Sequence, residues 1–125
     1  MGQYCTAFAV TKEEDPRLRR VVRCEQSYRT GLLCKYYLEE HLGYKIGTRI
    51  KTPPCIAGYG DLGLYEDNTE CTLLTPAKYV WMILRVRADA AKDGVELYDD
   101  AMCDWLTSLS YDHAACFDIC LVEEE

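Results

Sequence analysis

Apolar residues recur at helical spacing between Thr75 and Gly94, and this is the longest regular pattern in the chain. Thr75 followed by Pro76 is a typical helix start, because threonine caps a first-turn N–H and proline has no N–H to leave unpaired. Gly94 suits the left-handed position that ends a helix. The same stretch is rich in β-branched and aromatic residues, so a strand over residues 78–88 is the alternative.

One apolar stripe of this helix is predicted to face the core. Its members are Ala77, Val80, Trp81, Leu84, Ala88 and Ala91. Three further apolar residues widen the stripe and predict burial on more than one side: Met82, Ile83 and Val86.

A second helical pattern runs from about Val95 to Leu109. Its predicted apolar face consists of Tyr98, Ala101, Met102, Trp105, Leu106 and Leu109. Acidic residues recur on another face at i, i+4 steps, with a fourth acid beside them: Glu96, Asp100, Asp104 and Asp99. Like charges at this spacing destabilise a helix by a few tenths of a kcal/mol per pair. The acidic face is therefore a candidate surface for a basic partner or a cation, and a solvated outer face is the alternative.

Alternating apolar and polar positions predict strands over residues 4–10, 18–25, 44–51 and 115–122. Pro53 and Pro54 are expected to end the third of these strands. A helix capped by Ser27 is predicted to run to about Leu42 and to end at Gly43. The first two strands suggest an antiparallel hairpin. The whole order predicts a single α+β domain over residues 1–125, with a small, mostly antiparallel sheet of three to five strands and about three helices packed on one face.

Residues 52–70 lack a regular period and are predicted to form a long irregular loop. The loop contains glycines at 58, 60 and 63, the spacing of a dinucleotide-binding turn. That mechanism requires a strand before the motif and a helix after it, whereas acidic residues follow here and would repel phosphate. Tyr59 and Tyr65 stand near these acids, so the loop is interpreted as a partner-binding loop.

The net charge of −7 is unevenly distributed along the chain. Residues 1–58 hold ten Lys/Arg and six Asp/Glu, a net +4, whereas residues 59–125 hold four and fifteen, a net −11. Nucleic acid is an unlikely partner, because phosphate binding needs a basic face. The acidic half suits a basic protein surface.

In the basic half, Arg17, Arg19 and Arg23 could hold a small anion or nucleotide, and a solvated strand face is the alternative.

Eight cysteines are present without any Cys-x-x-Cys pair. The sequence shows no secretory signal, so the thiols are expected to be reduced, mostly as core residues, in a cytoplasmic protein.

His113, Cys116 and Cys120 would share a face on a helix, where Cys103 could complete a zinc site. On a strand His113 points the other way. The strand is favoured, and no cofactor or metal is expected.

Membrane attachment is not expected either. No apolar run is long enough to span a bilayer. Gly2 and Thr6 match the myristoylation pattern, with Cys5 as a second lipid position, but strand-like alternation begins at once and no basic cluster follows.

No catalytic constellation is recognisable, so a non-enzymatic interaction protein is the leading hypothesis. It would act as an inhibitor or adaptor, of a kind carried by phages or other mobile elements, and would bind a basic surface of another protein. The predicted binding residues are Glu96, Asp99, Asp100, Asp104, Tyr59 and Tyr65. The alternatives are an anion or nucleotide binder and a zinc- or thiol-dependent protein, and a homodimer remains open.

Overall fold

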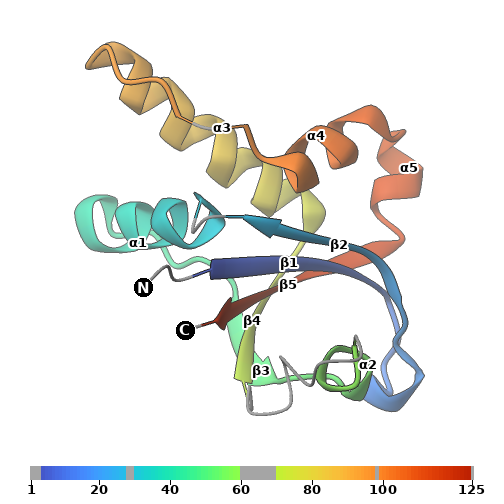
Figure 1. The fold of residues 1–125 in the computed structure, drawn as a ribbon. Coiled ribbons are helices and arrows are strands. Elements are labelled where there is room, and N and C mark those ends of the chain that lie inside the picture. Colours follow the sequence, from blue (N-terminus) through green and yellow to red (C-terminus); the bar gives the residue numbers. More distant parts are fainter. Residues whose placement is uncertain (1–3, 28–29, 60–69, 98, 125) are drawn as a thin grey trace.

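The computed structural model describes residues 4–27, 30–59, 70–97 and 99–124 (Figure 1). Its strands are β1 (Tyr4–Thr11), β2 (Val21–Ser27), β3 (Thr48–Lys51), β4 (Glu70–Leu74) and β5 (Phe117–Glu124). Its α-helices are α1 (Thr30–Leu42), α2 (Pro54–Ala57), α3 (Pro76–Lys92), α4 (Ala101–Ser108) and α5 (Tyr111–Ala114). A short 3-10 helix, η1 (Pro16–Leu18), lies between β1 and β2.

The five strands form one sheet in the order β2-β1-β5-β4-β3, and all neighbouring strands are antiparallel. β1 and β2 form the predicted hairpin, with a shift of register between Ala9 and Val10. β5 is inserted between β1 and β4, where Ala7 faces Leu121 and Leu121 in turn faces Thr72. The prediction of an α+β domain with a small antiparallel sheet is confirmed.

The predicted set of three helices, α1, α3 and α4, covers one face of this sheet (Figure 1). Strand β1 presents only small side chains to them, so the helices can approach closely. The buried residues of this side include Cys5, Ala7, Ala9, Leu38, Tyr79, Met82, Ile83, Met102, Leu106, Ile119 and Leu121.

The other face of the sheet is buried as well, which the sequence pattern did not predict. Its core consists of Phe8, Val10, Cys71, Cys120 and Val122 from the strands together with Ile56 from α2. The proline pair that was expected only to end a strand begins this helix, because Pro54 occupies the first turn, where its missing N–H costs nothing.

Several predicted boundaries are wrong. Residues 16–18 belong to η1, which Asp15 caps, so β2 begins only at Val21. Ser27 is the last residue of β2 and therefore does not cap α1. The region predicted as a loop over residues 52–70 contains α2 and the first residue of β4, a strand that was not predicted; residues 60–69 lie outside the described part.

β3 begins at Thr48 rather than at residue 44, and Gly47 makes the turn into it with φ of 68°. A Cβ at this position would lie 2.6 Å from Thr72 Cγ2 and 2.7 Å from the Leu73 carbonyl oxygen. Only glycine combines this backbone conformation with so close an approach to β4.

Helix α3 starts and ends as predicted, and the alternative strand over residues 78–88 is wrong. The Thr75 side chain accepts a hydrogen bond from the Lys78 N–H, and Gly94 has φ of 72°. In Figure 1 the C-terminal end of α3 extends beyond the sheet. Among the described residues, no helix is long and apolar enough to cross a membrane.

Candidate protein-binding surface

Helix α3 has two opposite apolar faces, and the structure buries the one that was not predicted to be the main core stripe. Tyr79, Met82 and Ile83 are fully buried against the sheet and α4. Leu84 follows Met82 by two residues, about 200° around the helix, and is 48% exposed. Most of the predicted core stripe therefore points outward: Ala77, Ala88 and Ala91 are exposed, whereas Val80 and Trp81 are half-buried and pack against the helix-side core. We call Ala77, Val80, Trp81, Leu84, Ala88 and Ala91 the outer stripe.

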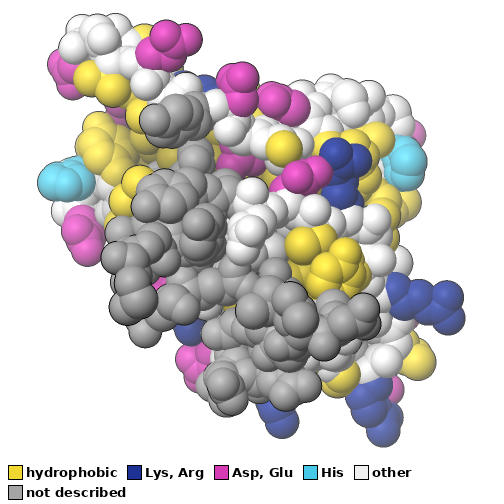
Figure 2. All heavy atoms as spheres, in the orientation of Figure 1, with side chains coloured by type: hydrophobic (Ala, Val, Ile, Leu, Met, Phe, Trp, Pro, Cys, Tyr) yellow, Lys and Arg dark blue, Asp and Glu magenta, His cyan; other side chains and the backbone are white. Residues whose placement is uncertain are grey.

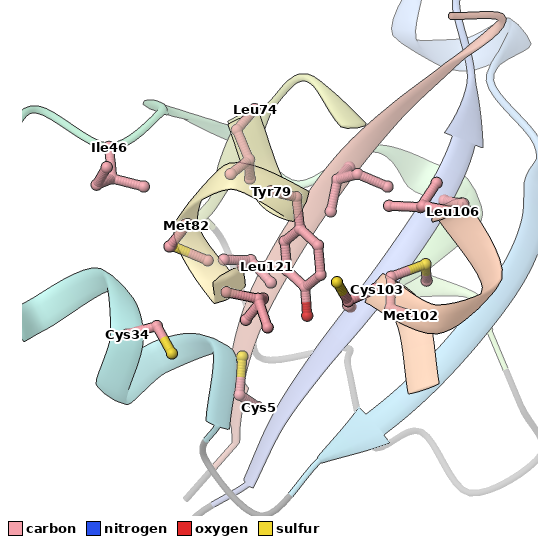
Figure 3. Packing of buried hydrophobic residues seen from close by; sticks show 14 of the residues in the cluster. Cys5, Cys34, Ile46, Leu74, Tyr79, Met82, Met102, Cys103, Leu106 and Leu121 are labelled. Atoms are coloured by element: carbon pink, nitrogen blue, oxygen red, sulfur yellow. The ribbon is translucent and has the colours of Figure 1, made fainter. Parts of the chain in front are cut away.

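Tyr79 lies on the buried face of α3, among buried side chains of α4 and the sheet (Figure 3), and its hydroxyl takes part in a buried hydrogen-bond network. The Tyr79 hydroxyl lies 2.9 Å from both carboxylate oxygens of Asp100 and donates to that group. Asp100 also accepts from the Cys103 N–H at 2.9 Å and so caps α4. The buried face of α3 is thereby tied to the start of α4.

This network removes Asp100 from the predicted partner-binding residues, because its side chain is interior. Asp100 is only 2% exposed. Burial raises the pKa of its carboxyl group, while the bonds from Cys103 and Tyr79 act in the opposite direction. Burial and the neighbouring carboxylate together raise the pKa of Tyr79 well above its usual range, so Tyr79 remains a donor.

The predicted acidic face of one long helix does not exist, because α4 begins only at Ala101. Glu96 and Asp99 lie in the connection before α4 and are exposed, and Asp104 is exposed on α4 itself. Spacing of four residues was therefore not a sign of a shared helical face, since Asp100 is the N-cap and not an interior helical residue.

Two of these three exposed acids lie beside the C-terminal half of α3. Glu96 and Asp99 line a hollow of about 380 Å³ together with Arg87 and Ala91 of α3. In Figure 2 acidic side chains are seen over the upper part of the molecule, where Figure 1 shows the far end of α3, the connection and α4. We call Glu96 and Asp99 the acidic edge.

The opposite side of the outer stripe is basic. Lys78, Arg85 and Lys92 follow one another at seven-residue intervals, which places them along one edge of the helix. Lys78 Nζ lies 4.4 Å from the ring centroid of Trp81, and Arg85 pairs with Asp89 at 3.3 Å. We call Lys78, Arg85 and Lys92 the basic edge.

A groove of about 690 Å³ continues the outer stripe toward α4 and α5. Most of its walls are apolar. They comprise Pro76, Ala77, Val80 and Trp81 of α3, Leu106 and Thr107 of α4, Leu109, Tyr111, Ala114 and Ala115, together with Lys12 and Thr75. Tyr111 at the border is 83% exposed. Stripe and groove together form a continuous apolar surface, with the basic edge along α3 and the acidic edge beside the C-terminal half of that helix.

The two tyrosines predicted to bind a partner do not extend this surface. Tyr59 packs edge-on against Phe8, with ring centroids 5.4 Å apart, on the opposite side of the sheet from α3. Tyr65 and most of the glycine motif lie outside the described residues.

The three arginines predicted to bind an anion are not brought together. Arg17 is exposed on η1 and pairs with Asp15 at 2.8 Å. Arg19 pairs with Asp118 at 2.9 Å, and strand alternation in β5 places Asp118 on the α2 side of the sheet. Arg23 pairs with Glu25 and lies 5.2 Å from the ring of Trp105, on the α4 side.

The predicted zinc candidates are also dispersed. Cys103 is buried on the helix side of the sheet, and Cys120 on the α2 side. Cys116 is exposed, and His113 packs on Phe117 with ring centroids 5.5 Å apart. Within the described ranges, no three His, Cys, Asp or Glu residues are placed to hold a metal ion. Five of the eight cysteines are buried thiols, as expected for core residues.

No protein-family model matches the chain, and searches of curated proteins and of solved structures returned no significant match.

Proposed function

We propose that this protein is a non-enzymatic interaction module that binds another protein through the outer stripe and the adjoining groove. The proposal depends on the second apolar face of α3, which points outward. A surface helix normally has one apolar stripe, which faces the core, and polar residues on the opposite face. Contiguous apolar surface on a soluble protein commonly marks a binding site.

The chemistry of the borders supports a partner with basic groups. Glu96 and Asp99 are exposed beside the apolar surface, where they can steer and orient Lys or Arg side chains of the partner. Exposed ion pairs each contribute only about 0–1 kcal/mol. The apolar stripe therefore supplies most of the affinity in this proposal, and the acidic edge supplies selectivity.

An inhibitor or adaptor acting in the cytoplasm is the biological role we propose, and the exposed and buried free thiols suit a reducing compartment. The suggestion of a phage or mobile-element origin is an analogy with other small acidic inhibitors.

The experiment is partner capture with matched variants of two exposed leucines. Leu84→Glu places a charge in the middle of the outer stripe, and Leu18→Glu makes the same change on η1, where the side chain is 60% exposed. We expect Leu84→Glu to abolish capture of a protein that both the wild type and Leu18→Glu retain. Equal capture by all three would refute the proposal.

A further inference from the structure

We propose that the partner is an amphipathic α-helix that lies along α3, with acidic side chains on one edge and basic side chains on the other. This inference rests on the proposed function and specifies the class of partner.

The spacing within the outer stripe favours a helix as the occupant. Ala77, Trp81, Leu84, Ala88 and Ala91 are separated by alternating steps of four and three residues. This is the spacing with which one helix packs against another in a coiled-coil seam. From Ala77 to Ala91 the seam is about 21 Å long, so a partner helix of about 18 residues would cover it.

The sizes of these side chains provide protrusions and hollows for such packing. Leu84 projects from the middle of the seam, half-buried Trp81 presents its remaining exposed surface beside it, and the alanines at both ends allow the two helix axes to approach closely. Trp81 is held in place by Tyr44, with ring centroids 5.2 Å apart, so it presents a fixed surface. At the N-terminal end the groove of about 690 Å³ has room for a large apolar side chain of the partner.

The two edges specify the charges of the partner. Acidic residues on the partner would face Lys78, Arg85 and Lys92 of the basic edge. Basic residues on its other side would face Glu96 and Asp99 of the acidic edge. A partner helix that carries the same sign of charge on both sides is repelled along one of the two edges, so it binds more weakly than a helix with mixed edges.

A second copy of this chain fits less well. If two copies packed with their α3 helices antiparallel, the basic edge of one copy would face the basic edge of the other, and the acidic edges would likewise face each other. In a parallel pair Trp81 would stand against Trp81 and alanine against alanine, which combines crowding with voids. The observed stripe therefore favours a different chain as partner.

The test uses three fluorescein-labelled peptides of about 18 residues, stapled on the outer side so that they are helical before binding. They share an apolar seam of Leu and Ala and carry Glu on one edge and Lys on the other, Glu on both, or Lys on both. Fluorescence anisotropy with the full-length protein is expected to show at least tenfold tighter binding of the mixed-edge peptide. Leu84→Glu should abolish this binding and Leu18→Glu should leave it unchanged.

Reversal of the basic edge is the decisive variant. Arg85→Glu/Lys92→Glu makes both edges acidic, so the preference is expected to change at least tenfold toward the all-Lys peptide. Equal binding of the three peptides, or a preference that the double variant leaves unchanged, would overturn the inference.

Two further outcomes would also overturn the helix inference. If no peptide binds while partner capture still depends on Leu84, the interaction function stands and the occupant is not such a helix. If sedimentation shows a dimer that Leu84→Glu dissociates, the occupant is a second copy of the chain.

Discussion

Asp100 stabilises the packing of α3 against α4 through hydrogen bonds from both helices, so its replacement has a predictable cost. Asp100→Ala removes the N-cap of α4, a loss of about 1 kcal/mol. It also leaves the Tyr79 hydroxyl, 1% exposed, without its acceptor, a loss of about 1–3 kcal/mol. We therefore expect the free energy of unfolding to fall by about 2–4 kcal/mol, a substantial part of the stability of an ordinary domain.

Asp100→Asn removes the negative charge at this position but keeps an oxygen that can accept the same hydrogen bonds. An asparagine oxygen can still accept from Cys103 and Tyr79, and asparagine is a good N-cap. We expect this variant to lie within about 1 kcal/mol of the wild type at pH 7, since it also avoids burying a negative charge.

The pH dependence of the wild type against Asp100→Asn tests the raised pKa. The folded protein holds the Asp100 proton more tightly than the unfolded chain, so this group's contribution to stability is fully present below the unfolded pKa near 3.8 and is lost as the pH rises through the folded pKa. The wild type should therefore gain stability relative to Asp100→Asn as the pH falls from neutral toward that value.

Urea unfolding followed by circular dichroism measures these differences, and other carboxylates cancel in the comparison of variants. The reasoning would be refuted if Asp100→Ala were as stable as Asp100→Asn at pH 7. A difference between the wild type and Asp100→Asn that stayed constant with pH would contradict the proposed effect of burial.

Three other changes have expected outcomes. Gly47→Ala should lower the free energy of unfolding by more than about 1 kcal/mol, because its Cβ would collide with β4 at a positive φ; an unchanged denaturation midpoint would contradict this. Thr75→Ala should cost about 1 kcal/mol by the same assay, since it removes the cap of α3, whereas Thr75→Ser should retain most of that stability. A thiol reagent at pH 8 should modify exposed Cys116 rapidly but Cys34 only after unfolding, because burial raises the pKa of Cys34 to about 12; mass spectrometry of digested peptides identifies the modified residue.

The ends of α3 could be predicted from sequence because they depend on local chemistry. Thr75, Pro76 and Gly94 act on the backbone within a few residues of themselves. The face that α3 buries could not be predicted in the same way, since both sides are apolar. The choice depends on the contact between Tyr79 and Asp100, residues from different helices that the fold brings together.

The acidic residues illustrate a missed local signal. Four-residue spacing suggested a continuous helix from Val95, although Asp100 before Ala101 also matches the usual N-cap and marks the true start of α4. The first turn of α2 was missed for a related reason, because Pro54 was taken only as the end of a strand. Each pattern has two interpretations: Asp100 could be a helix interior residue or an N-cap, and Pro54 could end a strand or begin a helix.

The position of β5 has a consequence for the order of folding. β2 can pair with β1, and β3 with β4, before residues 117–124 are in place, but only β5 joins these two halves into one sheet. Its contacts with β1 connect residues more than a hundred positions apart, such as Ala7 and Leu121, and closing such a large loop slows the search for the native state. We expect addition of β5 to be a late step, before which the inner borders of both half-sheets are exposed to unwanted pairing with other chains.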